Sequence, residues 1–165
     1  MSLYPADIEA VAARIVAQFA ARGLSVATAE SCTGGLIIGA LTEISGSSAI
    51  VDRGFITYSN QAKIDLLGVQ PETLERHGAV SRQTATEMVE GALNCSGCGV
   101  AVAVTGVAGP GGGSAEKPVG LVHLAAKSST GPLLHREMRY GDVGRSEIRL
   151  ATVRTALEML MEAAG

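Results

Sequence analysis

The segment ESCTGG at residues 30–35 combines hydroxyl and thiol side chains with two glycines, where an alternating apolar stretch gives way to an apolar helical one. A serine at such a strand-to-helix turn lies beside backbone N–H groups that have no partner within the helix and can bind an oxyanion. Ser31 is therefore suited to nucleophilic catalysis. The alternative is that Ser31 or Thr33 simply caps the helix, which is the usual role of these residue types at this position.

Cys32 is a rival nucleophile within the same segment. An arrangement of Cys32 or Ser31 with a histidine base is possible, but no histidine lies close in the sequence or in a glycine-marked turn. The histidines of the chain are His77, His123 and His135.

A serine without histidine needs another base, and the segment YSNQAK at residues 58–63 supplies a candidate. If Asn60 caps the helix that follows, Lys63 falls in its first turn, where the positive end of the helix dipole lowers the pKa of an amine. With burial added, Lys63 could be neutral enough to take a proton from serine, and Tyr58 could relay or orient that proton. The alternative is that Lys63 is a solvated surface lysine and Tyr58 a half-buried strand residue.

A third candidate region is the stretch TGVAGPGGGS at residues 105–114, in which five of the ten residues are glycine. It follows the most apolar strand, and glycines allow backbone N–H groups to approach a phosphate closely. The spacing matches neither a Walker A motif nor a dinucleotide fingerprint, so the choice is between a phosphate-binding loop and a long flexible loop. Arg145 follows the expected helix cap Asp142 and could reach an anion or form an exposed ion pair.

The remaining cysteines, Cys95 and Cys98, have CxxC spacing but no second pair and no expected helix after them. This disfavours a metal site or a redox role. Three cysteines are an odd count in a chain of this size, which fits a reducing compartment without stabilising disulfides.

The 165 residues fit one domain, and we expect residues 1–165 to form it. Apolar types make up 47% and charged types 18%, which is enough apolar material for a folded core. The net charge of -3 and the aromatic content of 3% disfavour a nucleic-acid partner. No apolar run approaches the roughly 20 residues that span a bilayer, and the start of the chain lacks signal-peptide features. We therefore expect a cytoplasmic protein with no membrane partner.

Apolar spacing predicts helices over residues 7–21, 36–41, 60–67, 82–93 and 142–164, with Gly23 ending the first and Ser81 capping the fourth. It predicts strands over residues 24–29, 54–58, 99–104, 119–126 and 133–140, the last two forming an antiparallel hairpin. This order predicts an α/β fold, a three-layer α/β/α sandwich on a mixed, largely parallel sheet.

Taken together, these segments resemble the CinA C-terminal domain family, whose enzymatic members are nicotinamide mononucleotide deamidases. The resemblance spans nearly the whole chain, and its motifs occur in the family order. The matching pieces are TAESCTGG at residues 28–35, GFITYSNQAK at 54–63, GAVS at 78–81, VTGVAGPGGG at 104–113 and KPVGLV at 117–122.

The resemblance implies hydrolysis of the amide of nicotinamide mononucleotide to nicotinic acid mononucleotide and ammonia, in pyridine nucleotide recycling, without metal or cofactor. Ser31 would be the nucleophile, Lys63 the general base and Tyr58 its helper. The residues that would bind the substrate or the oxyanion are Cys32, Thr33, Gly34, Thr105, Gly106, Gly109, Gly111 and Arg145.

The resemblance also bears on partners and on the alternative function. Many relatives carry this domain behind a larger molybdopterin-binding-like domain that is absent here, so the chain looks like the stand-alone form. We expect a homo-oligomer, a dimer, whose partner is a small-molecule nucleotide. The alternative is a non-catalytic nucleotide-binding module or a regulatory module associated with competence, the DNA-uptake process for which the family was named.

Overall fold

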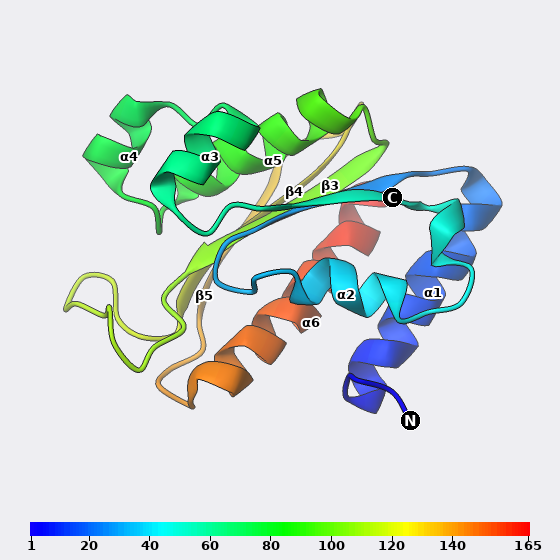
Figure 1. Cartoon of the computed structure of the whole chain (residues 1–165), viewed down its shortest axis with the longest axis horizontal. Coiled ribbons are helices and arrows are strands. Elements are labelled where there is room, and N and C mark those ends of the chain that lie inside the picture. The colour runs from blue at the N-terminus through cyan, green and yellow to red at the C-terminus, as the bar shows by residue number, and fades with distance from the viewer.

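A five-stranded mixed sheet lies at the centre of the fold in the computed structural model, which describes residues 1–165 (Figure 1). The strand order is β2-β1-β3-β4-β5. β1 pairs in parallel with β2 and β3, whereas β4 is antiparallel to both β3 and β5. Four strands therefore run one way and β4 alone runs the other. The strands are β1 (Val26–Glu30), β2 (Val51–Ile56), β3 (Val100–Gly106), β4 (Leu121–Ser128) and β5 (Leu134–Arg139).

Helices cover both faces of the sheet, which confirms the three-layer sandwich (Figure 1). One face packs against α1 (Ala6–Arg22), α2 (Leu36–Thr42) and α6 (Arg145–Ala164). The other packs against α5 (Arg82–Ser96), on which α3 (Asn60–Leu67) and α4 (Pro71–His77) lie. A 3-10 turn, η1 (Ser47–Ala49), leads into β2. The sequence patterns missed α4, a short helix that contains no buried residue and so has no apolar stripe.

The two faces of the sheet differ in side-chain size, because alternate residues of a strand point to opposite faces. The face toward α1, α2 and α6 carries mainly valines and a leucine, whereas the face toward α5 carries alanines, among them Ala27, Ala29, Ala101 and Ala103. Small side chains let α5 approach the sheet closely. α5 also approaches α3 closely, since a Cβ atom added to Gly91 would lie 2.0 Å from the carbonyl oxygen of Leu67.

Two of the expected helix caps are wrong. α3 is capped by Ser59, whose hydroxyl accepts a hydrogen bond from the N–H of Ala62 at 3.0 Å, and Asn60 is its first helical residue. Lys63 therefore stands one position further into the helix than expected. α6 begins after Gly144 rather than at Asp142, because glycine at φ +97° takes the backbone into the helix with no side-chain cap. The cap of α5 is confirmed, since Ser81 accepts from the N–H of Thr84 at 3.1 Å.

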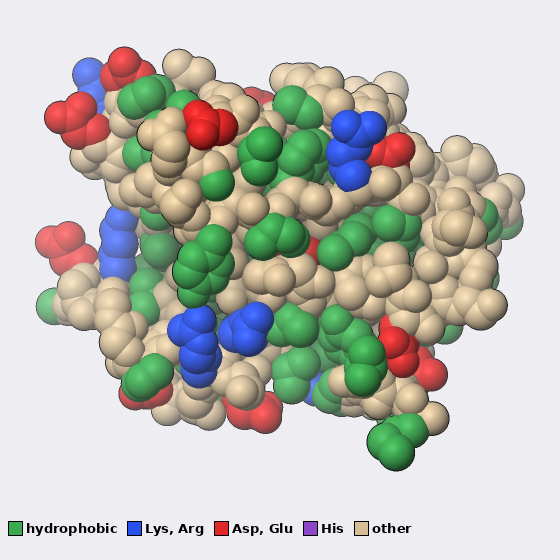
Figure 2. Space-filling model, in the orientation of Figure 1, with side chains coloured by type: hydrophobic (Ala, Val, Ile, Leu, Met, Phe, Trp, Pro, Cys, Tyr) green, Lys and Arg blue, Asp and Glu red, His purple; other side chains and the backbone are tan.

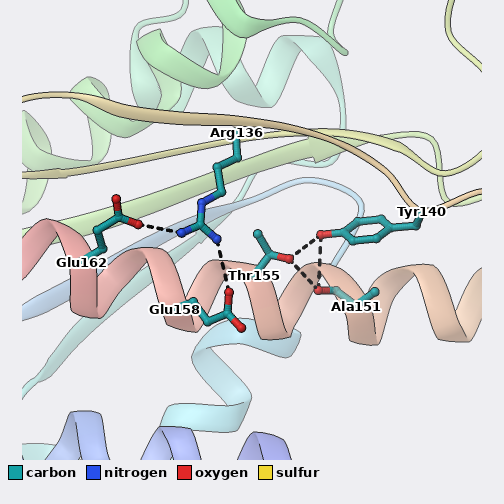
Figure 3. A network of polar contacts seen from close by, with 6 residues as sticks. All are labelled: Arg136, Tyr140, Ala151, Thr155, Glu158 and Glu162. Atoms are coloured by element: carbon teal, nitrogen blue, oxygen red, sulfur yellow. Dashed lines mark hydrogen bonds and ion pairs between the residues drawn. The ribbon is translucent and has the colours of Figure 1, made fainter.

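Polar contacts from β5 fix the position of α6 (Figure 3). Arg136 forms ion pairs with Glu158 at 3.2 Å and with Glu162 at 2.6 Å. The hydroxyl of Tyr140, just after β5, lies 2.7 Å from the hydroxyl of Thr155. These contacts tie successive turns in the second half of α6 to the sheet.

The surface seen in Figure 2 shows Lys and Arg side chains singly or in small groups among apolar and acidic ones. No helix has the length and apolar character that crossing a membrane requires.

Candidate active site

A pocket of about 290 Å³ opens at the edge of the sheet where β1 and β3 end. Parallel strands bring their carboxyl ends to one edge, and ligands of open α/β sheets bind there. The start of α3 and the first turn of α6 reach the same edge. Of the residues predicted for the site, the pocket is lined by Ser31, Cys32, Tyr58, Lys63, Thr105, Gly106, Gly109, Gly111 and Arg145. The structure does not bring Thr33 and Gly34 to its wall.

Ser31 and Lys63 meet at the bottom of this pocket, where the Lys63 Nζ atom lies 3.1 Å from the Ser31 Oγ atom. Only 1% of Lys63 is exposed, and this burial lowers the pKa of its amine. The alternative of a solvated surface lysine is therefore wrong. The same nitrogen lies 2.9 Å from the carbonyl oxygen of Thr57 and 3.3 Å from that of Tyr58.

In the structure, the Lys63 nitrogen donates to three acceptors, the Ser31 hydroxyl and the carbonyls of Thr57 and Tyr58. A neutral amine has two N–H donors and one lone pair, so after loss of a proton the two carbonyls still accept and the lone pair can face Ser31. A lone pair at 3.1 Å from a serine hydroxyl is within the reach that a general base needs. The pocket therefore pairs a serine hydroxyl with a buried lysine amine, and no histidine lines it.

Glu30, which the sequence analysis did not single out, holds the turn in shape. Its fully buried carboxylate accepts hydrogen bonds from the N–H groups of Ile37 at 2.9 Å and Ile38 at 3.0 Å, in the first turn of α2. It also accepts from the hydroxyls of Thr33 at 2.7 Å and Thr28 at 3.0 Å. A carboxylate is favoured at a helix N-terminus. Neither Ser31 nor Thr33 caps α2, so that alternative is wrong and the Ser31 hydroxyl stays available to Lys63.

We expect Glu30→Gln to destabilise the fold by about 3 kcal/mol, because an uncharged amide weakens several buried hydrogen bonds and turns a donor toward backbone N–H groups. Urea unfolding measures the change. Glu43→Gln is the matched control at the other end of α2, where the carboxylate accepts only from the N–H of Leu3, and it should cost well under 1 kcal/mol. Equal unfolding midpoints for the two variants would contradict the role assigned to Glu30.

Cys32 is placed beside the serine but not activated. Its side chain is buried, and burial raises the pKa of its thiol to about 12. The thiol is therefore protonated at neutral pH and is a poor nucleophile. The backbone N–H groups of Cys32 and Thr33 donate to no acceptor in the chain. Cys32 lines the pocket, whereas Thr33 is fully buried directly behind it.

The glycine-rich loop at residues 105–114 forms one wall of the pocket. It is the yellow-green loop that extends beyond the sheet in Figure 1. The N–H groups of Ala108, Gly109, Gly111 and Gly112 donate to no acceptor in the chain. Gly109 has φ +73°, and a Cβ atom there would lie 2.6 Å from a methyl group of Val119, so this position requires glycine. The loop therefore brings unpaired backbone donors and only small side chains to this wall.

Arg145 and Tyr58 form the rim of the pocket. The Arg145 guanidinium donates to the carbonyl oxygen of Gly109 at 2.8 Å and to the hydroxyl of Tyr58 at 3.0 Å. Tyr58 is 60% exposed, and it contacts Lys63 only through its backbone carbonyl. The structure therefore does not bring the Tyr58 hydroxyl to the amine that it was expected to assist.

The CxxC pair lies away from this pocket, with Cys95 exposed near the end of α5 and Cys98 buried after it. All three cysteines are free. No group of three or more His, Cys, Asp or Glu side chains is placed to hold a metal ion.

Over most of its length the chain is similar to known proteins. A family model described as the CinA C-terminal domain matches residues 8–164. The chain is 53% identical over 137 residues to the nicotinamide-nucleotide amidohydrolase PncC of Enterobacter agglomerans, covering 82% of each protein. It is 48% identical over 143 residues to the PncC of Escherichia coli K12, covering 86% of each. The chain spans only 36% of a longer relative from Acetivibrio thermocellus.

A solved structure is also similar over its full length. The crystal structure of the competence/damage inducible protein CihA from Agrobacterium tumefaciens matches with a TM-score of 0.99 and 69% sequence identity, covering 100% of both chains.

Proposed function

The chain belongs to the CinA C-terminal domain family, and from this membership and the site geometry we propose that it is a nicotinamide-nucleotide amidohydrolase. It hydrolyses nicotinamide mononucleotide to nicotinic acid mononucleotide and ammonia, in pyridine nucleotide recycling. The observation that carries the proposal is the 3.1 Å contact between Ser31 Oγ and the buried Lys63 amine in the pocket. The PncC relatives named above support the substrate class.

The first half of the reaction forms an acyl-enzyme. Lys63 takes the hydroxyl proton of Ser31 while Oγ attacks the amide carbon, which gives a tetrahedral intermediate. The negative charge of the former carbonyl oxygen is stabilised by the N–H groups of Cys32 and Thr33. Lys63 then returns the proton to the amide nitrogen, the C–N bond breaks, and ammonia leaves.

The second half repeats these steps with water. Lys63 takes a proton from a water molecule that attacks the ester carbon, and the same N–H groups stabilise the second oxyanion. Collapse of that intermediate breaks the bond to Ser31 Oγ, which regains a proton from Lys63. The products are the nicotinic acid nucleotide and free enzyme, so atoms and charge balance without a further reactant.

The substrate phosphate is held by the glycine-rich loop and Arg145. The loop offers free N–H groups at Ala108, Gly109, Gly111 and Gly112, and backbone N–H groups bind phosphate oxygens well. Arg145 lies at the same wall and adds a positive charge. We expect Tyr58, which is exposed at the rim, to contact the ring or the ribose of the substrate.

Ammonia release from the purified protein offered nicotinamide mononucleotide, with EDTA present, tests the proposal. We expect stoichiometric ammonia and nicotinic acid mononucleotide. Binding of the mononucleotide without ammonia release would instead support the non-catalytic nucleotide-binding or competence-associated module.

Nicotinamide riboside is expected to be a poor substrate, because it lacks the phosphate that the loop N–H groups and Arg145 bind. Losing several charge-assisted hydrogen bonds should lower kcat/KM by about a hundredfold or more. The measurement is a comparison of kcat/KM for the riboside and the mononucleotide in the same ammonia assay. Comparable values would remove the phosphate-binding role from the loop.

A further inference from the structure

We propose that Arg149 is a positioning residue that aims the oxyanion-binding N–H groups, an inference that rests on the proposed function. Arg149 lies in α6, one turn after Arg145, and its guanidinium reaches across to the turn that carries Ser31. Its Nε atom donates to the carbonyl oxygen of Cys32 at 3.0 Å, and its Nη2 atom donates to that of Thr33 at 2.9 Å.

The first contact fixes the direction of one oxyanion donor. The C=O and N–H groups of a trans peptide point in opposite directions. Because the Cys32 carbonyl points toward Arg149, the N–H of Thr33, which belongs to the same peptide unit, points away from α6. That N–H has no acceptor in the chain.

The neighbouring peptide unit is fixed within the turn itself. The carbonyl of Ser31 accepts a hydrogen bond from the N–H of Gly34 at 3.1 Å, so the N–H of Cys32 is held in the opposite direction and is also without an acceptor. Two successive N–H groups beside Ser31 are thus without an acceptor, and unpaired backbone N–H groups are the donors that bind anions. Arg149 supplies the only side-chain contact to the carbonyls of Cys32 and Thr33.

Arginine suits this task better than lysine. Its planar guanidinium donates to two carbonyls at once. Because its charge is permanent, it polarises the Cys32–Thr33 peptide and makes the Thr33 N–H a stronger donor. The guanidinium also lies against Gly34, where φ is +59° and a Cβ atom would lie 3.4 Å from Nη2. A Cβ atom at that distance is in ordinary contact, so the positive φ is what favours glycine at Gly34, which was expected to bind substrate.

The test compares kinetics of Arg149→Met and Arg149→Lys with those of the wild type on nicotinamide mononucleotide. An oxyanion donor stabilises mainly the transition state, so losing its orientation should affect kcat more than KM. We expect Arg149→Met to lower kcat by about a hundredfold with KM within about threefold. Arg149→Lys should recover part of kcat, since it restores one charged hydrogen bond. Arg145→Met is the matched control and should mainly raise KM.

A second measurement keeps the inference independent of turnover. Benzeneboronic acid forms a tetrahedral adduct with an activated serine, and its affinity, measured by calorimetry, should fall for Arg149→Met in step with kcat. An unchanged kcat and boronate affinity, or a raised KM with kcat intact, would overturn the role of Arg149. If the wild type released no ammonia, the proposed function would be wrong. The boronate affinities of the wild type and Arg149→Met would still test the role of Arg149. If Arg149→Met failed to fold, Arg149→Lys would decide by the same two measurements.

Discussion

Ser31→Ala should lower kcat on nicotinamide mononucleotide by at least about a thousandfold, because it removes the nucleophile that forms the acyl-enzyme. The fold should stay intact, since the side chain of Ser31 is small, its hydroxyl is hydrogen-bonded only to Lys63, and it caps no helix. The affinity for substrate should also remain, because the loop donors and Arg145 are untouched. Ammonia release gives kcat, and calorimetry with the mononucleotide gives the affinity.

Cys32→Ala is the matched control for that prediction, and it should retain most of the activity. The thiol is buried and protonated at neutral pH, because burial raises its pKa to about 12. The oxyanion donor at this position is the backbone N–H, which alanine keeps. An inactive Cys32→Ala together with an active Ser31→Ala would show that the serine mechanism is wrong.

The second large effect concerns Lys63, which we expect to act as a base only in its neutral form. Burial lowers the pKa of this amine below the value of roughly 10.4 that an exposed lysine has. Only the deprotonated amine can take the proton of Ser31. Activity should therefore rise with pH through the pKa of Lys63, which lies below that of an exposed lysine, and level off above it.

Lys63→Arg and Lys63→Met separate charge from basicity. Arginine keeps the positive charge but does not lose a proton in proteins, so we expect it to be as inactive as methionine, with kcat down by about a thousandfold. The measurement is kcat for both variants across the pH range in which the wild type changes. An arginine variant with most of the wild-type activity would mean that Lys63 contributes charge to binding and that another group is the base.

Local patterns in the sequence were sufficient for most of the fold. Apolar periodicity within single elements found the five strands and every helix with a buried stripe, and it placed the turn with Ser31 between a strand and a helix. The position of Lys63 could also be predicted, because the start of α3 follows directly from β2. Asn60 and Ser59 are both good caps in adjacent positions, so sequence alone did not separate them.

Long-range contacts explain what the sequence could not show. Arg149 reaches Cys32 across 117 residues, and the Tyr58 hydroxyl is bound by Arg145 from 87 residues away rather than by Lys63. Glu30 caps α2 from the end of β1, outside the spacing at which a cap is sought. An acidic residue at a strand end directly before Ser31 was the available signal for Glu30. No comparable local signal exists for Arg149.

The close approach of α5 to α3 at Gly91 limits how this protein can vary. Leu67, whose carbonyl fills the space beside Gly91, lies four residues after Lys63 and thus on the same side of α3. A methyl group on Gly91 would have to push that backbone away and would carry the amine with it. Displacements of about 1 Å can cost a hundredfold in rate. We therefore expect a side chain at Gly91 to lower the activity by displacing Lys63, the proposed base, although Gly91 does not line the pocket.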